Sequence, residues 1–409
     1  MAMQVPETYP LEASAATYGE PIMRAPEKPP VPKVRHRKLV GGRTGNQAIA
    51  GWLFVLPMIV IIGMFLLIPV GMAAWVSVSN WNGNGSPFGA DFVGVANYQR
   101  LLTGTGLATR NLGTALRNNL YYVLLVVPLQ TIISLALAIL VNQKVLKAKG
   151  MFRTAYYFPS VTSSVAITVI FMFLFSASGA VNRALAVLGG SGPNWLADPR
   201  GFIHIILGWF GVTSPPAALQ ASPLLAVAWW DWLAGPSVAM WVFIFMAIFT
   251  TSGTFMLLFL AALQQIDGEV EEAAMVDGAT GWQKIRHVTV PMLRPTIFTV
   301  ITLGLIGTWQ VFDQIFTGTQ GGPQSTTMTP AFLSYQTSFI DTQWGNGAAI
   351  AFILFFIIVV MTLLQRFILR DRQKVPRRKQ FSYLRAQDRR AAGPVAGSAA
   401  DPVVSGVSR

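Results

Sequence analysis

The sequence predicts an all-α membrane protein with six transmembrane helices and both termini in the cytoplasm. Hydrophobic residues make up 53% of its 409 residues and charged residues only 11%, whereas soluble domains carry about 25% charged residues. A helix needs about 20 apolar residues to cross a bilayer. Six stretches meet this requirement, near 51–78, 119–142, 155–178, 238–263, 294–316 and 348–369.

The positions of Lys and Arg indicate how these helices are oriented. With the N-terminus inside, 25 of the 30 Lys and Arg residues fall on cytoplasmic segments and five on external ones. Cytoplasmic loops are enriched in these residues, so the net charge of +13 reflects topology and we expect no nucleic-acid binding. The same pattern predicts two basic cytoplasmic tails, a disordered one over residues 1–49 and another over 371–409.

A polar segment, residues 264–295, separates the fourth and fifth apolar stretches. Glutamates at its start favour a helix N-terminus, and the pair Asp277-Gly278 is expected to end that short helix. Thr280 with Gln283 three residues later has the spacing of a capping box, which begins a second short helix. The segment therefore predicts a lever on the cytoplasmic surface, with an ordinary amphipathic linker as the alternative.

The same segment resembles the EAA loop of binding-protein-dependent ABC importer permeases. The resemblance rests on Glu272-Ala273-Ala274, on Gly278 and on the ending Val288-x-Val290-Pro291, in which isoleucine or leucine is more usual at the two valines. In that family the loop is a coupling helix that docks in a groove on a separate ABC ATPase dimer. The resemblance implies that the coupling residues here are Glu272, Ala273, Ala274, Asp277, Gly278 and Pro291.

Further motifs in the same order resemble sugar permeases of the MalF/UgpA type. They are DFVGVANY at 91–98, NWLADP at 194–199, WQVFDQ at 309–314 and TQGGP at 319–323. The resemblance covers about residues 50–370. It implies the type I ABC importer permease fold and a multi-pass protein of the cytoplasmic (inner) membrane of a prokaryote, in contact with membrane lipid.

An external insert of uncertain role follows the NWLADP motif, at about residues 199–236. It holds an apolar stretch too short to span, Phe202 to Phe210, and a tryptophan cluster, Trp229-Trp230-Asp231-Trp232. Tryptophan favours the membrane–water interface. We therefore expect either an interfacial hairpin at the outer rim or a contact surface for the binding protein.

A path for sugar needs hydroxyl and amide groups, with aromatic faces, inside an apolar bundle. Two spans offer such groups, and the candidates are Thr250, Thr251, Ser252, Thr254, Trp309, Gln310, Asp313 and Gln314. The threonine cluster has helix–helix packing as its alternative explanation. For Asp313 the alternative is an ordinary solvated or paired carboxylate at the outer interface.

No catalytic constellation is present, and the three histidines lack the spacing of metal ligands. A GxxxxGK[ST] loop is also absent, so we expect ATP and Mg on a partner ATPase and no cofactor on this chain. The resemblance implies ATP-driven import of a sugar or a related polyol such as glycerol phosphate. The implied partners are an ABC ATPase dimer, a second, non-identical permease subunit and an extracytoplasmic solute-binding protein.

Two functions from other classes remain as alternatives. A stand-alone secondary transporter or channel predicts ionisable residues inside several spans, and this chain has almost none. A membrane-anchored scaffold or sensor predicts a folded soluble domain, whereas both tails have the composition of disordered segments.

Overall fold

The computed structural model describes residues 45–143, 148–221 and 224–368. The predicted tails, 1–49 and 371–409, lie outside these residues, except that 45–49 belong to the first helix. Two units are distinguished, residues 1–64 and residues 65–409. In the first unit the described helix is α1, an apolar helix with Pro57 in its interior.

The order of the elements is α1 (Gly45–Ile62), η1 (Gly63–Leu67), α2 (Ile68–Ser77), β1 (Ser79–Asn80), η2 (Pro87–Gly89), β2 (Asp91–Phe92), α3 (Ala96–Leu102), α4 (Leu107–Asn142), α5 (Lys149–Val161), α6 (Ser164–Leu174), α7 (Ala180–Val187), α8 (Phe202–Trp209), η3 (Ala217–Leu219), α9 (Trp229–Trp232), α10 (Val238–Leu263), α11 (Gly268–Val276), α12 (Gly281–Lys284), η4 (Ile285–Thr289), α13 (Val290–Met292), α14 (Arg294–Trp309), α15 (Asp313–Gly318), α16 (Pro330–Tyr335), η5 (Gln336–Ile340) and α17 (Trp344–Ile368). Of the η elements, η1, η4 and η5 are π-helices, and η2 and η3 are 3-10 helices.

Five helical stretches in the described residues are long and apolar enough to span a membrane. They are Ala50–Ser77, Leu107–Asn142, Val238–Leu263, Arg294–Gly318 and Trp344–Ile368. These stretches correspond to the first, second, fourth, fifth and sixth predicted spans, although the helix of the second begins twelve residues earlier than expected.

The third predicted span, 155–178, is not one straight helix. Its place is taken by α5 and α6, which meet at an angle of 97° and count as a sixth span only if taken together. Pro159 lies in the last turn of α5 and cannot donate a backbone hydrogen bond. Thr162 and Ser163 then adopt extended backbone angles, so the helix stops and restarts in a new direction.

The core of the second unit forms around α4 and α10, which pack along each other, while α5 and α14 pack against both. One apolar cluster joins Leu112 and Val126 of α4 to Phe243 of α10. Close approach of α10 to α5 depends on Gly253, because a β-carbon there would collide with the backbone oxygen of Tyr156.

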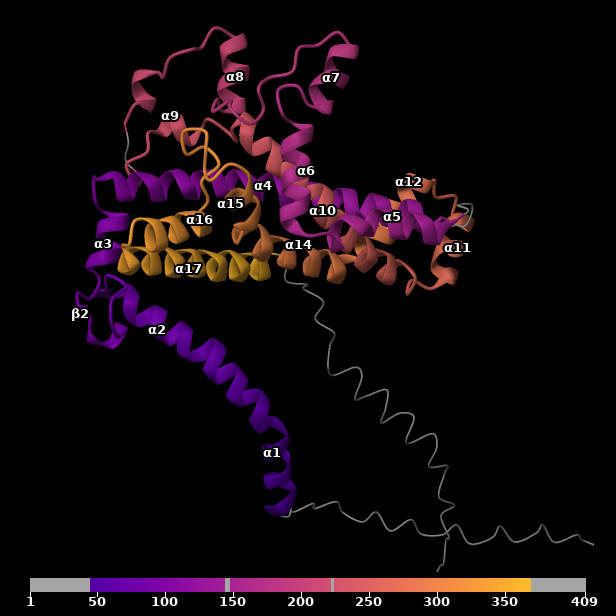
Figure 1. The fold of residues 1–409 in the computed structure, drawn as a ribbon. Helices are drawn as coiled ribbons and strands as arrows, with labels where there is room; N and C mark the ends of the chain where they lie inside the picture. The colour runs from indigo at the N-terminus through magenta and orange to yellow at the C-terminus, as the bar shows by residue number, and fades with distance from the viewer. Residues whose placement is uncertain (1–44, 144–147, 222–223, 369–409) are drawn as a thin grey trace, which may run out of the picture. The chain divides into compact units, whose positions relative to one another are not determined.

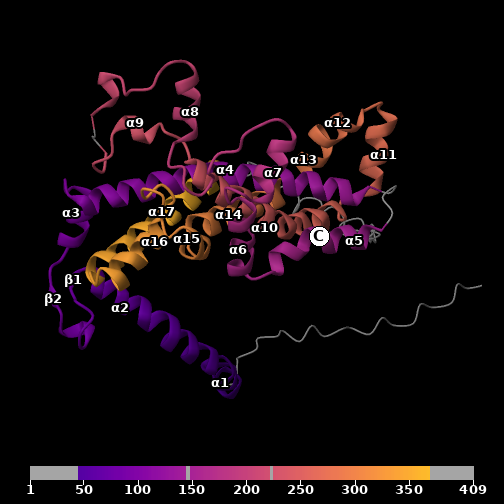
Figure 2. The ribbon, with the colours of Figure 1, turned by 45° about the horizontal axis from the view of Figure 1, so that its top comes forward.

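Two opposite ends of the bundle can be followed in both ribbon views. The helices α11 and α12 lie at one end, and β1, β2 and α3 lie at the other (Figures 1 and 2). At the latter end β1 and β2 pair antiparallel, with Ser79 opposite Phe92. Asn97 of the DFVGVANY motif is buried there, and its amide donates to the backbone oxygens of Ser77 and Ser79, both at 3.0 Å.

The two ends of the external insert, residues 199–236, come together at its base. Gly201 and Ser237 pair across its base, and Ile203 N–H donates to the Ala234 oxygen at 3.0 Å. The apolar stretch within the insert folds as α8, and the tryptophan cluster folds as α9. In both ribbon views the insert rises from the side of the bundle beside the first half of α4 (Figures 1 and 2).

Candidate functional site

The coupling segment, residues 264–295, folds as the two short helices that the sequence predicts. Asp267 caps α11, its side chain accepting from the Glu269 N–H at 3.2 Å. After Asp277 the chain turns at Gly278, whose φ is +76°, in the left-handed region that favours glycine. The capping box is present: the Thr280 N–H donates to the Gln283 side chain at 2.8 Å, and the Gln283 N–H donates back at 3.3 Å.

The coupling segment presents apolar side chains to its surroundings. Val276 is 88% exposed and Trp282 is 69% exposed. Of the predicted coupling residues, Glu272, Ala273, Asp277 and Gly278 are exposed, whereas Ala274 and Pro291 are half-buried. Exposed apolar side chains of this kind are what the predicted docking role of the segment requires, and that role stays a prediction.

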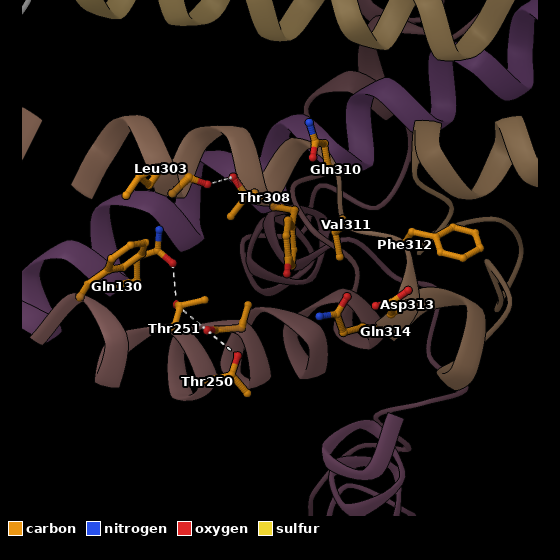
Figure 3. A pocket seen from close by; sticks show the side chains of 15 residues that line it. Gln130, Thr250, Thr251, Leu303, Thr308, Gln310, Val311, Phe312, Asp313 and Gln314 are labelled. Carbon is orange, nitrogen blue, oxygen red and sulfur yellow. Dashed lines mark hydrogen bonds between the residues drawn. The ribbon is translucent and has the colours of Figure 1, made fainter. Parts of the chain in front are cut away.

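A cavity of about 420 Å³ lies between α4, α10, α14 and the start of α15. Its polar lining comes from Tyr122, Gln130, Thr250, Thr251, Thr308, Gln310, Asp313 and Gln314. Figure 3 shows Gln130 on one side of this hollow and Asp313 and Gln314 on another, with the two threonines between them. Hydroxyl and amide groups therefore converge inside an otherwise apolar bundle, as in sites that bind small polar ligands.

A second cavity, of about 290 Å³, adjoins the first, since Thr250, Thr251 and Gln314 line both. Its remaining polar lining includes Ser160 and Thr162 from the break between α5 and α6. Backbone that leaves helical geometry at membrane depth is tolerated where it lines a cavity. The bend in the third predicted span thus borders the site.

The break between α14 and α15 is stabilised by polar groups of neighbouring elements. The buried Asn119 amide donates to the oxygen of Trp309, the last residue of α14, at 3.0 Å. The Thr329 hydroxyl donates to the Val311 oxygen at 2.9 Å. These bonds satisfy two backbone carbonyls at the break, next to Gln310 and Asp313.

Gln130 carries an unused hydrogen-bonding group beside the cavity. Its side chain is fully buried in α4. The Thr251 hydroxyl, which has one hydrogen, lies 2.7 Å from the Gln130 Oε1 and 2.7 Å from the Ala247 oxygen. Nε2 has no partner and faces Gly304, where a β-carbon would collide with it. In either orientation of the amide one polar atom of Gln130 stays without a partner, and in this structure that atom, Nε2, is enclosed against Gly304 of α14.

The structure brings together most, but not all, of the predicted path residues. Thr250, Thr251, Gln310, Asp313 and Gln314 line the first cavity, and Thr254 lines the second. Ser252 is buried and donates to the Ile248 oxygen. Trp309 is 3% exposed in an apolar cluster with residues of α4 and α17, and it lines neither cavity.

Several lining residues were not predicted from the sequence. The polar and aromatic ones in the first cavity are Tyr122, Gln130, Phe255, Thr308 and Phe312. For Gln130 a signal exists, because it is the one amide in the apolar run from Leu120 to Val141. A polar residue at membrane depth indicates function when it has an unmet bonding need.

Comparisons with known proteins agree on one family. Residues 101–374 match the family described as "Binding-protein-dependent transport system inner membrane component". The lactose transport system permease protein LacF of Rhizobium radiobacter is 30% identical over 332 residues, which cover 80% of this chain and 95% of that protein. The multiple sugar-binding transport system permease protein MsmF of Streptococcus mutans is 31% identical over 315 residues, 77% of this chain and 93% of that one.

A solved structure shares the fold. It is a bacterial ABC transporter involved in the import of the acidic polysaccharide alginate, with a TM-score of 0.59 and 20% identity over 80% of this chain and 98% of that one. This likeness agrees with the type I permease fold. Together with the family match, it shows that the chain belongs to the family of binding-protein-dependent transport system inner membrane components, as a multi-pass permease subunit whose ATPase is a separate subunit.

Proposed function

We propose that this permease subunit imports a neutral sugar or a related neutral polyol. The observation that carries the proposal is the cavity between α4, α10, α14 and α15, with its hydroxyl and amide lining. Sugar hydroxyls both donate and accept, so they match such a lining. The names of similar permeases, which include lactose, multiple-sugar and arabinooligosaccharide systems, support this substrate class.

The charge of the cavity favours a neutral substrate. Asp313 is the one ionisable side chain besides Tyr122 among the lining residues of the first cavity, and neither cavity has a Lys or Arg in its lining. An anion would meet an acidic group and no cation from this chain, which disfavours binding. A phosphorylated polyol such as glycerol phosphate is therefore a poorer fit than an uncharged sugar.

In the proposed transporter the chain pairs with a second, non-identical permease subunit, and both contact an ABC ATPase dimer that binds ATP and Mg. A solute-binding protein delivers the substrate from outside. Both termini and the coupling segment face the cytoplasm, as the distribution of Lys and Arg indicates, and the membrane is the cytoplasmic (inner) membrane of a prokaryote. A solved relative has been crystallised with a bound periplasmic protein, which supports this assembly.

The coupling step is proposed to pass through the coupling segment. Closure of the ATPase dimer would push on α11 and α12, whose exposed Val276 and Trp282 supply apolar contact area. The chain runs from α10 through α11 and α12 into α14, and α11 and α12 lie at one end of the bundle. A movement of α11 and α12 can therefore reach the cavity, which α10 and α14 line. Alternating access of this kind is largely rigid-body movement around a fixed site.

Co-purification of the tagged chain from its native membrane tests the assembly. The variants are Glu272→Lys and Trp282→Ala, and the matched control is Phe88→Ala, which removes an equally exposed ring near β2, at the other end of the bundle. We expect the two coupling variants to lose the ATPase while they keep the second permease, and the control to keep both. If wild type purifies without an ATPase and moves sugar without ATP, the proposal is wrong and the chain works alone.

A further inference from the structure

The insert lacks charge over an unusual length. From Gly201 to Trp230 the thirty residues contain no Asp, Glu, Lys or Arg. At the usual frequency of about 25% charged residues, a water-exposed loop of this length would carry several. The environment of the insert is therefore not bulk water alone.

Hydrogen bonds from α4 fix the position of the insert along the bundle. Arg117 Nη1 donates to the Asp231 oxygen at 3.2 Å, and one helical turn further along the Tyr121 hydroxyl donates to the Trp232 oxygen at 2.6 Å. Gly113, a turn before Arg117, is in close contact with Leu225, and a β-carbon there would collide with it. The insert is thus held against two turns of α4.

Those two turns lie where α4 enters the membrane. Arg117 is the last charged residue before a run, 118–143, without any Asp, Glu, Lys or Arg. About 20 residues of helix cross the hydrocarbon layer, so Arg117 and Tyr121 mark its boundary. The tryptophans of α9 therefore lie at the level of the lipid headgroups, where tryptophan and tyrosine concentrate.

The start of α8 packs on the rest of the protein, whereas its C-terminal end, Trp209 with the following Phe210, is exposed. The His204 ring stacks on Trp230 with centroids 4.2 Å apart, and Phe202 packs edge-on against Trp241 of α10 at 5.5 Å. At the other end of α8, Trp209 is 78% exposed and Phe210 is 80% exposed, before Gly211 turns the chain away with φ +83°. Two adjacent large aromatic side chains thus project from a short helix that is itself anchored at the interface.

We propose that the insert is an interfacial membrane anchor, whose Trp209–Phe210 tip enters the lipid headgroup–acyl boundary beside the bundle. Lipid fits this surface better than a protein partner does. Protein interfaces are ringed by polar and charged residues, and residues 201–230 offer none of the charged ones. An exposed Trp–Phe pair is the kind of apolar surface that interfacial elements bury at the headgroup–acyl boundary.

The absence of native cysteine permits a direct test. A Phe210→Cys variant is labelled with an environment-sensitive fluorophore in the transporter, purified with its subunits and placed in nanodiscs. The matched control is Asn84→Cys, on an exposed polar turn between β1 and β2. The unsubstituted chain gives the background from other subunits.

We expect lipids with brominated acyl chains to quench the label at position 210 at least two-fold more than the label at 84, and aqueous iodide to show the reverse order. If iodide quenches both positions equally and brominated lipid neither, the tip is in water and the proposal is overturned. If position 210 becomes protected from iodide only when binding protein is added, the surface belongs to that partner instead. A Trp209→Cys variant that keeps Phe210 repeats the test should the first variant fail to assemble.

Discussion

The Gln130 amide and the Thr251 hydroxyl meet at 2.7 Å across the α4–α10 contact, and they leave one buried polar atom of Gln130 without a partner. A buried amide with an unmet bond costs free energy. Nε2 is enclosed against Gly304 in this structure, so we expect substrate to make the missing bond when the Gln130 side chain turns towards the cavity during transport.

Replacing Gln130 by methionine, which has a similar shape, is expected to weaken substrate use without unfolding the protein. Loss of one hydrogen bond of about 1 kcal/mol raises KM roughly five-fold, whereas removal of an unsatisfied amide leaves Tm unchanged or higher. Uptake into proteoliposomes and thermal melting measure the two effects.

Gln365→Met is the matched control for Gln130→Met. Gln365 is equally a buried glutamine with one unpartnered atom, Oε1, but its Nε2 donates to the Phe298 oxygen and the Thr302 hydroxyl and it lies outside both cavities. We expect this variant to lower Tm and to leave KM unchanged. An unaltered KM in Gln130→Met would exclude a bond between Gln130 and the substrate.

Asp313 is expected to set the charge preference of the cavity. In wild type an anionic sugar, such as a uronic acid oligosaccharide, should inhibit uptake of the neutral substrate only weakly. Asp313→Lys should make it inhibit at a concentration roughly ten-fold lower, a change of about 1.4 kcal/mol, while Asp313→Asn should keep neutral uptake. If wild type already takes up the anionic sugar, selection for neutral substrates is wrong and the second permease supplies the missing cation.

Gly278 is expected to support ATPase binding because it allows a left-handed backbone angle, and not because a larger side chain would clash. A β-carbon at this position meets no atom within 4 Å, yet the φ of +76° is costly for other residues. Alanine at position 278 should destabilise this turn by about 1 kcal/mol. Asparagine should destabilise it less, since asparagine tolerates left-handed geometry. ATPase recovery on co-purification should therefore fall in the order wild type, Gly278→Asn, Gly278→Ala. Equal recovery from the two variants would contradict the role of φ.

Features with local causes were predictable from the sequence. The capping box of Thr280 and Gln283 and the turn at Gly278 depend on neighbours within a few residues, and the structure confirms both. The extent of α10, Val238–Leu263, agrees with the predicted span, because Ser237 caps one end and the polar segment begins at the other.

Features that depend on helix orientation were not predictable. The spans are apolar on all sides, so the sequence does not tell which face meets the cavity. Trp309 therefore looked like a path residue but packs against α4 and α17, whereas Gln130, alone in an apolar run, faces the cavity. Pro159 gave a local reason for a kink, but the 97° bend also needs the extended backbone after it.

Protonation of His204 at acid pH is expected to lower the folding stability of the insert. Burial is the main cause that lowers the pKa of His204; the nearby Arg117 lowers it further, while the bond to the Trp230 oxygen and the charge of Asp231 raise it. The unfolded insert therefore binds a proton more readily than the folded one. Its stability is complete above the ordinary histidine pKa of about 6.5 and falls as pH drops through that value towards the lowered pKa.

Limited proteolysis of the insert in the assembled transporter should accordingly speed up between pH 7.5 and pH 5. A His204→Gln variant, which keeps a donor able to reach the Trp230 oxygen but does not titrate, should show a flat profile after correction for the protease's own pH dependence on an unfolded substrate. Asp198 provides an internal comparison, because its hydrogen bonds to Arg200 hold the pKa of that carboxyl below its usual range. The contribution of Asp198 to stability is lost only below this pH range. A rise in proteolysis between pH 7.5 and pH 5 that persists in His204→Gln would therefore assign the effect to another group.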